Sequence, residues 1–353
     1  MRQAVIIADS DPRKKVIGGI GIYSGNLADY LSSHGYEVLF LAKRQEGEEI
    51  RKVHYDVIEA NRRPGESNIS FLMSLFRRFP IQPDAVINAQ RPDWIIPFAF
   101  HKGRKIVTLN GSHAKNVALK KGKLAGFLFG ILEKRGLSAA DSIISVSKEN
   151  TQYYSGKYPG LAGKIRTIPV GIDISRFVRS RSRREEYGFR KDEKVVVYVG
   201  RFEREKNLPL LIDSCKSAGC RLLLVGSGKE EQALRQLAGK ETVFLPSVPN
   251  EEVPDILSSG DVFAVSSLYE GLPNAALEAL ACGLPIISTP VGGMPDIVVE
   301  GKTGSLAGPD EYADKLKLLL KDHKRYAHAC KMMAENYSAD KMFPEVMRLY
   351  ENL

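Results

Sequence analysis

The sequence predicts an α/β protein with two domains, each containing a parallel β-sheet covered by helices. Short apolar runs alternate with stretches in which apolar residues recur every three to four positions, as expected for βαβ units. The pattern restarts after residue 190, and a chain of 353 residues is too long for one ordinary hydrophobic core. A charged stretch with few apolar residues, 175–194, separates the two halves.

The first half contains six apolar runs that we predict to be buried strands. They comprise residues 4–8, 37–42, 84–88, 105–109, 142–147 and 164–169. Between the first two runs, Tyr23, Leu27, Tyr30 and Leu31 have the spacing of one helix face. Strands and helices that alternate in this way favour a parallel sheet with both faces covered.

The second half repeats this organisation with five predicted strands. They comprise residues 195–200, 220–226, 242–246, 261–267 and 284–289. Helical spacing at Leu208–Ala218 and Lys229–Leu237 lies between the first three of these strands. The last segment, 311–353, is predicted to be helical, with interruptions near Ser338 and Pro344.

The domain boundaries follow from these patterns, with a linker at about Gly171–Phe177. We predict a first domain over residues 1–172, a second domain over 173–335 and a C-terminal helix over 336–353.

Composition indicates a soluble globular protein and excludes several other classes. The chain is 43% hydrophobic and 26% charged, and it has no apolar run long enough to span a bilayer. The apolar stretch at the N-terminus is too short for a signal peptide and is predicted to be the first strand. The four cysteines form no CxxC pair, so we expect small core residues in a reduced, cytoplasmic protein without a zinc site.

The positive charge is confined to the first half of the chain. Residues 1–178 contain 27 Lys and Arg against 16 Asp and Glu, whereas the remainder contains 24 against 26. This asymmetry suggests that the first half has an anionic partner, such as a membrane surface, a phosphorylated acceptor or a nucleic acid.

The segment from Tyr269 to Gly283 carries the most specific pattern in the chain. Its loop contains Glu270, and Glu278 follows eight residues later in a short alanine- and leucine-rich helix. Pro273 suits the first turn of that helix, and Gly283 suits the left-handed position beyond its end. A helix N-terminus attracts phosphate and carboxylates accept hydrogen bonds from hydroxyls, so the segment fits a phosphorylated polyol. The alternative is that Glu278 is a solvated helix residue and Glu270 an ordinary loop acid.

A basic loop follows the strongest predicted strand of the second half, where ligands of open α/β sheets bind. Gly200 permits close approach of the backbone, and Arg201 and Lys206 could both reach one anionic group such as a diphosphate. The alternative is a surface loop in which these bases pair with their own neighbours Glu203 and Glu205.

Two further glycine motifs follow strands of the second half. Gly226 and Gly228 enclose a serine in a turn that is not a P-loop, because the position five residues before Gly228 is Leu223. Such a turn could receive a base or a ribose. Gly292 and Gly293 similarly permit close ligand approach, or form a plain strand-to-helix loop.

The first half has weaker motifs. The glycines from Gly18 to Gly21 open a helix but do not fit a dinucleotide fingerprint, since the required acid at the second strand end is absent. The triplet from Asp9 to Asp11 is common in strand-end loops. Asn110 and His113 follow the fourth predicted strand, and a lone histidine is usually structural.

Taken in order, these motifs resemble those of the retaining glycosyltransferases of family 4. The resemblance covers nearly the whole chain and includes Pro169-Val-Gly171-Ile-Asp173 and the Glu270-x7-Glu278 pair. It implies the GT-B fold, in which two Rossmann-like domains with parallel sheets face each other across a cleft and the C-terminal helix, 336–353, crosses back to the first domain. It further implies transfer of a sugar from a nucleoside-diphosphate sugar to an acceptor hydroxyl, with no metal and no cofactor.

The resemblance assigns roles to individual residues. Arg201 and Lys206 would hold the diphosphate, Glu270 the donor sugar and Glu278 the ribose. The donor-binding set would be Gly19, Gly200, Gly226, Gly228, Gly271, Leu272, Pro273, Asn274 and Glu278. Family members often carry a histidine directly after the strand 105–109, where this chain has Asn110, so either Asn110 or His113 is expected to take that role.

The basic first half then suggests an acceptor or a surface. Residues 115–135 and 71–79 combine lysines or arginines with apolar residues, which suits an anionic membrane at its inner face. Ordinary helices with solvated lysines are the alternative. The acceptor is expected to be a glycan, a lipid-linked molecule or a small molecule. Two other functions stay open, a nucleotide-sugar epimerase and a non-catalytic nucleotide-sugar-binding protein. No nucleic-acid recognition motif is present, so nucleic acid is not expected as a partner.

Overall fold

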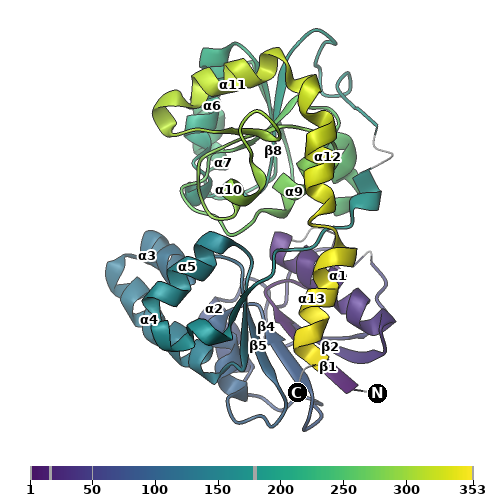
Figure 1. Cartoon of the computed structure of the whole chain (residues 1–353), viewed down its shortest axis with the longest axis vertical. Coiled ribbons are helices and arrows are strands. Elements are labelled where there is room, and N and C mark those ends of the chain that lie inside the picture. The colour runs from purple at the N-terminus through teal and green to yellow at the C-terminus, as the bar shows by residue number, and fades with distance from the viewer. Residues whose placement is uncertain (1, 16–17, 50, 178–180, 352–353) are drawn as a thin grey trace. The chain divides into compact units, whose positions relative to one another are not determined.

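The computed structural model describes residues 2–15, 18–49, 51–177 and 181–351, so the last two residues of the predicted C-terminal helix lie outside it. The chain divides into two compact units (Figure 1). The first unit comprises Met1–Val170 and Met342–Leu353, and the second comprises Gly171–Lys341. Each unit contains a parallel sheet with helices between its strands, which confirms the predicted pair of Rossmann-like folds.

The first unit has a seven-stranded sheet in the order β3-β2-β1-β4-β5-β6-β7. Its strands are β1 (Arg2–Ala8), β2 (Tyr36–Ala42), β3 (Asp56–Glu59), β4 (Val86–Ala89), β5 (Lys105–Leu109), β6 (Ser142–Ser145) and β7 (Ile165–Thr167). The strand order reverses between β1 and β4, and such a reversal leaves room for a ligand at the carboxyl ends of the strands. Gly19 follows β1 and Asn110 follows β5 at that edge.

Helices cover the sheet of the first unit. They are α1 (Gly19–Ser33), α2 (Asn68–Ser74), η1 (Pro92–Phe98), α3 (His113–Lys121), α4 (Lys123–Ala139), α5 (Lys148–Lys157), η2 (Pro159–Lys164) and α13 (Ala339–Glu351), whose residues from Met342 belong to this unit. Phe71 packs edge-on against Trp94 in the core. Tyr350 of α13 is fully buried, and its hydroxyl accepts a 2.9 Å hydrogen bond from Asn88 Nδ2 of β4.

The second unit has a six-stranded sheet in the order β10-β9-β8-β11-β12-β13. Its strands are β8 (Val195–Val199), β9 (Arg221–Val225), β10 (Thr242–Leu245), β11 (Val262–Val265), β12 (Ile286–Ser288) and β13 (Gly304–Leu306). The order reverses between β8 and β11, so the loops that leave these two strands flank the expected ligand position.

The helical segments of the second unit are mostly short. They are η3 (Ile174–Phe177), η4 (Arg204–Lys206), α6 (Leu208–Ala218), α7 (Glu231–Leu237), η5 (Asn250–Glu252), α8 (Val253–Leu257), α9 (Asn274–Ala281), α10 (Met294–Ile297), η6 (Pro309–Glu311), α11 (Tyr312–Lys321), η7 (His323–Tyr326) and α12 (Ala327–Glu335). Helix α12 packs on α9, and α11 packs on α6.

The predicted elements agree with the structure except at three places. All eleven predicted strands are present, but β3 and β13 were not predicted. The helical segment is interrupted near Ser338 as predicted, whereas the interruption predicted at Pro344 is wrong because α13 continues through that residue. Among the described residues, no helix has the length and apolar character needed to cross a bilayer.

Candidate functional site

The candidate site of the second unit lies in the loops that leave β8 and β11. The ammonium of Lys206 and the carboxylate of Glu270 form a mostly buried ion pair. Ser267 Oγ donates a 2.8 Å hydrogen bond to the same carboxylate oxygen of Glu270. Ser266 Oγ donates a 2.8 Å hydrogen bond to the backbone oxygen of Lys206. Ser266 therefore ties the loop of β11 to the loop of β8, and Ser267 orients Glu270 within its own loop toward Lys206.

Arg201 lies on the same loop as Lys206 but has a different environment. Its Nη2 lies 3.5 Å from Oε1 of Glu205, a buried carboxylate, while most of the guanidinium is exposed. The backbone N–H of Leu268 donates a 2.8 Å hydrogen bond to the carbonyl oxygen of Glu205. The alternative in which each base pairs with an acid of its own loop therefore holds for Arg201, whereas Lys206 pairs with Glu270 from the neighbouring loop.

Two glycines of the site are required by the close approach of two backbone segments. A Cβ atom on Gly226 would lie 1.9 Å from the carbonyl oxygen of Gly200, and one on Gly228 would lie 2.2 Å from that of Phe202. The N–H of Phe202 also donates a 2.8 Å hydrogen bond to the carbonyl oxygen of Ser227. The loops after β8 and β9 thus pack directly on each other, which is sufficient to explain glycine at these positions.

The start of helix α9 is supported by the loop that contains Gly292 and Gly293. The N–H of Gly293 donates to the carbonyl oxygen of Gly271 at 2.5 Å. Gly292 has φ +60°, and a Cβ atom there would lie 2.4 Å from the same oxygen. Leu272 is buried below this contact, Pro273 directly precedes the helix, and Asn274 is its first residue. The helix N-terminus therefore has a defined position close to Glu270, which lies in the loop that leads into it.

Glu278 is buried inside α9, so its interpretation as a solvated helix residue is wrong. Burial raises the pKa of its carboxyl group to about 7, while the nearby positive charge of Arg176 lowers it. Gly283 has φ +83°, which is the left-handed conformation predicted beyond the helix end. A buried carboxyl group that titrates near neutral pH is an uncommon feature, and such groups concentrate at functional sites.

In the first unit, Asn110 is part of a polar network at the carboxyl edge of the sheet. Its Nδ2 donates a 3.0 Å hydrogen bond to Oε1 of Gln90, and Gln90 Nε2 donates to Oδ1 of Asn88 at 3.4 Å. Asn88 also accepts a 2.9 Å hydrogen bond from Thr108 Oγ1. Through Asn88 the network reaches Tyr350, so helix α13 is coupled to the position of Asn110.

His113 is buried at the start of α3. Its backbone N–H donates a 3.3 Å hydrogen bond to the hydroxyl of Tyr154, which donates in turn to Oε1 of Glu133 at 3.0 Å. Burial, with a smaller contribution from the charge of Arg91, lowers the pKa of the imidazole to about 3. Among the described residues, no group hydrogen-bonds to Nε2 of His113. The ring is therefore neutral at physiological pH.

The remaining motifs of the first unit lie at the carboxyl end of β1. Gly19 is the first residue of α1, whose preceding residue Gly18 provides no side-chain cap. Asp11 of the acidic triplet is fully buried and forms a 2.7 Å ion pair with Arg13. Within the described ranges, no group of three or more His, Cys, Asp or Glu side chains is arranged to hold a metal ion.

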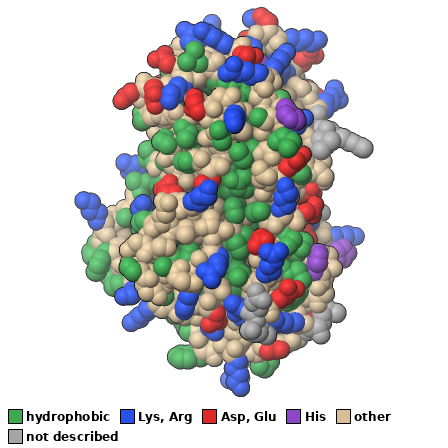
Figure 2. All heavy atoms as spheres, in the orientation of Figure 1, with side chains coloured by type: hydrophobic (Ala, Val, Ile, Leu, Met, Phe, Trp, Pro, Cys, Tyr) green, Lys and Arg blue, Asp and Glu red, His purple; other side chains and the backbone are tan. Residues whose placement is uncertain are grey.

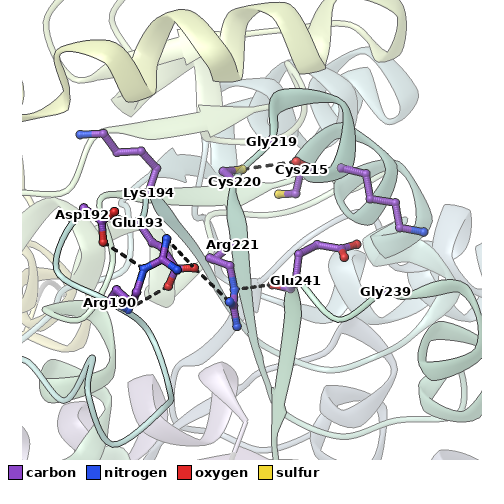
Figure 3. Close-up of a pocket in the computed structure, with 11 residues that line it drawn as sticks. Arg190, Asp192, Glu193, Lys194, Cys215, Gly219, Cys220, Arg221, Gly239 and Glu241 are labelled. Atoms are coloured by element: carbon purple, nitrogen blue, oxygen red, sulfur yellow. Dashed lines mark hydrogen bonds and ion pairs between the residues drawn. The ribbon is translucent and has the colours of Figure 1, made fainter.

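An open pocket of about 670 Å³ lies at the other end of the second sheet, where the strands begin (Figure 3). Its lining includes Arg190, Glu193 and Arg221, and none of the predicted site residues. Both guanidiniums point to the carboxylate of Glu193, and Arg221 Nη1 lies 3.1 Å from it (Figure 3). The two arginines of this pocket are thus paired with one of its own acids.

Comparison with known families decides the identity of the chain. The model of "Glycosyltransferase Family 4" matches residues 17–176, and the model of "Glycosyl transferases group 1" matches residues 180–337. The chain belongs to glycosyltransferase family 4.

Relatives and solved structures agree with this family 4 assignment. The chain is 30% identical over 228 residues to a D-inositol 3-phosphate glycosyltransferase of Mycobacteroides abscessus, which covers 60% of this chain and 52% of the relative. It spans about half the length of the first curated relatives that it matches. Sucrose-phosphate synthase from Thermosynechococcus elongatus has a TM-score of 0.86 at 22% identity, with 99% of this chain and 98% of that chain covered. HepE of Anabaena in complex with UDP-glucose has a TM-score of 0.78 at 16% identity, with 100% of both chains covered. At these identities the solved structures show the fold alone, which is GT-B.

Several residues of the candidate site were not identified from the sequence. Ser266 and Ser267 position Lys206 and Glu270, and Gln90 positions Asn110. The signal available for the serines was their place at the end of the predicted strand 261–267, where polar side chains meet a ligand edge. Gln90 had a comparable position, two residues after the predicted strand 84–88.

Proposed function

We propose that this chain is a retaining glycosyltransferase that moves a sugar from a nucleoside-diphosphate sugar to an acceptor hydroxyl. The observation that carries the proposal is the contact between Lys206 and Glu270 at the strand-order reversal of the second sheet, next to the N-terminus of α9. This places a cation, a carboxylate and a helix N-terminus where a diphosphate and sugar hydroxyls can bind together. Family membership and the UDP-glucose complex of HepE support the same donor class.

The main electrostatic task in this reaction is to stabilise the leaving diphosphate. Negative charge grows on its oxygens as the anomeric C–O bond breaks, and preorganised donors reduce that cost. We assign this role to Arg201 and Lys206, with backbone N–H groups of the segment 271–274. On donor binding, Lys206 would exchange part of its contact with Glu270 for the phosphate, and Glu270 would accept from hydroxyls of the sugar.

Glu278 is proposed to bind the ribose. Two ribose hydroxyls that donate to its carboxylate favour the ionised form and so lower its pKa from about 7 in the free protein. Donor binding should therefore release a proton near pH 6. Calorimetric titrations with UDP in buffers of different ionisation enthalpy measure this release, and Glu278→Gln should abolish it.

The loops that contain Gly200, Gly226 and Gly228 are proposed to contact the base and the diphosphate through their backbone. Their packing on each other leaves no room for a side chain at Gly226 or Gly228. A rigid backbone surface suits recognition of a planar base, because it loses little conformational freedom on binding.

We propose that the anomeric configuration is retained because the nucleoside diphosphate leaves and the acceptor hydroxyl attacks on the same face of the sugar. Glu270 is held in the ion pair with Lys206 and by Ser267, which favours a binding role over that of a nucleophile. The anomeric proton coupling of the product, measured by NMR, distinguishes retention from inversion.

The acceptor side is proposed to include Gly19 and either Asn110 or His113. Asn110 is partly exposed and held by Gln90, whereas His113 is buried, so Asn110 is better placed to meet a substrate. Asn110→Ala should lower kcat, and His113→Gln should act chiefly on stability. Equal losses of kcat in both variants, at equal folded fraction, would contradict this assignment.

The acceptor is proposed to be a glycan, a lipid-linked molecule or a small molecule, used by a cytoplasmic protein that can associate with the inner face of the membrane. The excess of positive charge in residues 1–178 supports an anionic partner on the acceptor side. Nucleic acid is not proposed as a partner, because the charge accompanies no recognition motif.

The deciding experiment incubates the purified protein with a panel of nucleotide sugars and measures nucleotide release, with thermal shift to rank affinity. Slow hydrolysis of one donor, increased by an acceptor, supports a glycosyltransferase. Formation of a new free sugar without any dependence on an acceptor supports the epimerase alternative. Tight binding with neither hydrolysis nor transfer supports a non-catalytic binding protein and would refute the proposal.

A further inference from the structure

Helix α4 presents an apolar stripe to solvent. The stripe has the i, i+3, i+4, i+7 spacing of one helix face, and its residues, with their exposed fractions, are Leu124 (73%), Phe127 (69%), Leu128 (54%) and Ile131 (45%). The opposite face of the helix is already used in the core, where Phe129 and Leu137 are buried. Because packing within the first unit explains only that inner face, the outer stripe needs a separate explanation.

The segment that carries this stripe is positively charged. Residues 113–132 include four lysines and neither Asp nor Glu. Lys120, Lys121 and Lys123 are exposed at the junction of α3 and α4. The next acid, Glu133, is fully buried and paired with Lys157 at 2.6 Å, so it does not neutralise this surface.

A second stripe of the same kind lies on and just after α2. Ile69, Met73 and Phe76 are 65%, 62% and 59% exposed, and the exposed Arg77 and Arg78 follow directly. Both α2 and α4 pack against η1 in the first unit. In Figure 2, hydrophobic and basic side chains lie side by side at the edge of the molecule where α3 and α4 lie in Figure 1.

We propose that the α4 stripe and the lysines at the α3–α4 junction dock on the surface of a bilayer that contains anionic phospholipid. Large apolar side chains on one face of a helix, flanked by lysines, insert into the boundary between headgroups and acyl chains. The lysines add attraction to anionic headgroups that salt screens. This inference identifies the element that contacts lipid, and it does not depend on which donor or acceptor the site uses.

The charge pattern favours lipid over a second copy of the chain. In a symmetric contact through the α4 stripes, Lys120, Lys121 and Lys123 of one copy would lie near those of the other, with no acid in residues 113–132 to offset them. Anionic headgroups supply the opposite charge along the whole stripe.

Flotation of the full chain with lipid vesicles tests this proposal. We expect binding to vesicles of phosphatidylcholine with phosphatidylglycerol at low salt, and weak binding to phosphatidylcholine alone. Phe127→Ser/Leu128→Ser should lower the bound fraction by about tenfold, since it removes two of the largest apolar groups of the stripe. Lys120→Gln/Lys121→Gln/Lys123→Gln should abolish the preference for anionic lipid and its salt dependence.

Matched controls come from the second unit. Leu318→Ser/Met332→Ser removes exposed apolar side chains from α11 and α12, and Lys191→Gln/Lys240→Gln removes exposed lysines. Neither control should change vesicle binding. Fluorescence of Trp94, the single tryptophan, reports folding of the first unit in every variant, and nucleotide release reports the donor site.

Three results would overturn the inference. The first is no vesicle binding by the wild-type chain at low salt. The second is equal binding by the stripe variant and its control. The third is self-association that Phe127→Ser/Leu128→Ser disrupts while vesicle binding is absent, which would assign the stripe to a contact between copies. If the wild-type chain binds vesicles but releases no nucleotide from any donor, that result counts against the proposed function and leaves this inference intact.

Discussion

Lys206 and Glu270 form an ion pair that joins the loops after β8 and β11, although 64 residues separate them in the sequence. Both side chains are mostly buried, so each would be left as a poorly compensated charge without the other. Ser266 and Ser267 hold the two loops in this arrangement. A cation and a carboxylate in contact form a preorganised pair. When a ligand binds, the cation can contact its phosphate and the carboxylate can accept hydrogen bonds from its hydroxyls.

Lys206→Ala should lower kcat by two or more orders of magnitude, because it removes one preorganised positive charge from the leaving diphosphate. The measurement is steady-state kinetics with the donor found in the panel. Lys240→Ala, at an exposed lysine of the same unit, is the control and should leave the rate unchanged. A near-wild-type rate for Lys206→Ala would refute the assigned role.

Glu278 should make the second unit less stable as the pH rises. Its folded pKa of about 7 lies above the unfolded value, so its favourable contribution is complete below about pH 4.5 and is lost as the pH rises through 7. Above pH 7 the buried charge should lower the free energy of unfolding of the second unit by about 3 kcal/mol, a loss that Glu278→Gln should not show. Hydrogen exchange of α9 peptides at pH 5 and pH 8 measures this, and the variant should be better protected at pH 8 alone.

The sequence was sufficient to predict the sheets because buried parallel strands are continuous apolar runs. The two missed strands lack that signal. Strand β3 has four residues bounded by Asp56 and Glu59, and β13 has three residues beginning with Gly304. A Cβ atom on Gly304 would lie 1.9 Å from the carbonyl oxygen of Ile286, so a glycine needed for strand pairing concealed the strand.

The wrong prediction at Pro344 has a different cause. Proline in a helix interior lacks an N–H and costs about 3 kcal/mol, so an interruption was expected. In α13 the residues Phe343, Val346 and Tyr350 are buried in the first unit, and this packing outweighs the local preference.

The site was predicted residue by residue, but its contacts were not. The sequence indicated Lys206 and Glu270 separately, since each follows a strand at the carboxyl edge. Their pairing depends on β8 and β11 being neighbours in the sheet, which strand order alone decides. The burial of Glu278 was equally hidden, because an acid in a short helix is usually solvated.

Gly226→Ala should destabilise the second unit by more than about 2 kcal/mol, because the new Cβ would meet the carbonyl oxygen of Gly200 at 1.9 Å in a backbone with φ +145°. Thermal unfolding followed by circular dichroism measures the change. Gly308→Ala is a matched control in the same unit, since its Cβ would meet one side-chain atom at 3.9 Å and its φ is −69°. Similar losses in both variants would show that the contact between the loops is not what requires glycine.

His113 should make the first unit less stable as the pH falls. Burial lowers its folded pKa to about 3, below the unfolded value of about 6.5. Its favourable contribution is therefore present above about pH 6.5 and is lost as the pH falls toward 3, because the unfolded chain then binds a proton that the folded chain does not. At pH 5.5 this loss should be about 1 kcal/mol.

Urea unfolding followed by Trp94 fluorescence measures the stability of the first unit, which contains both Trp94 and His113. His113→Gln should lower stability at pH 7.5 through imperfect packing but should lose less on acidification than the wild-type chain. Parallel losses in the two proteins between pH 7.5 and pH 5.5 would show that His113 is not held neutral in the folded state.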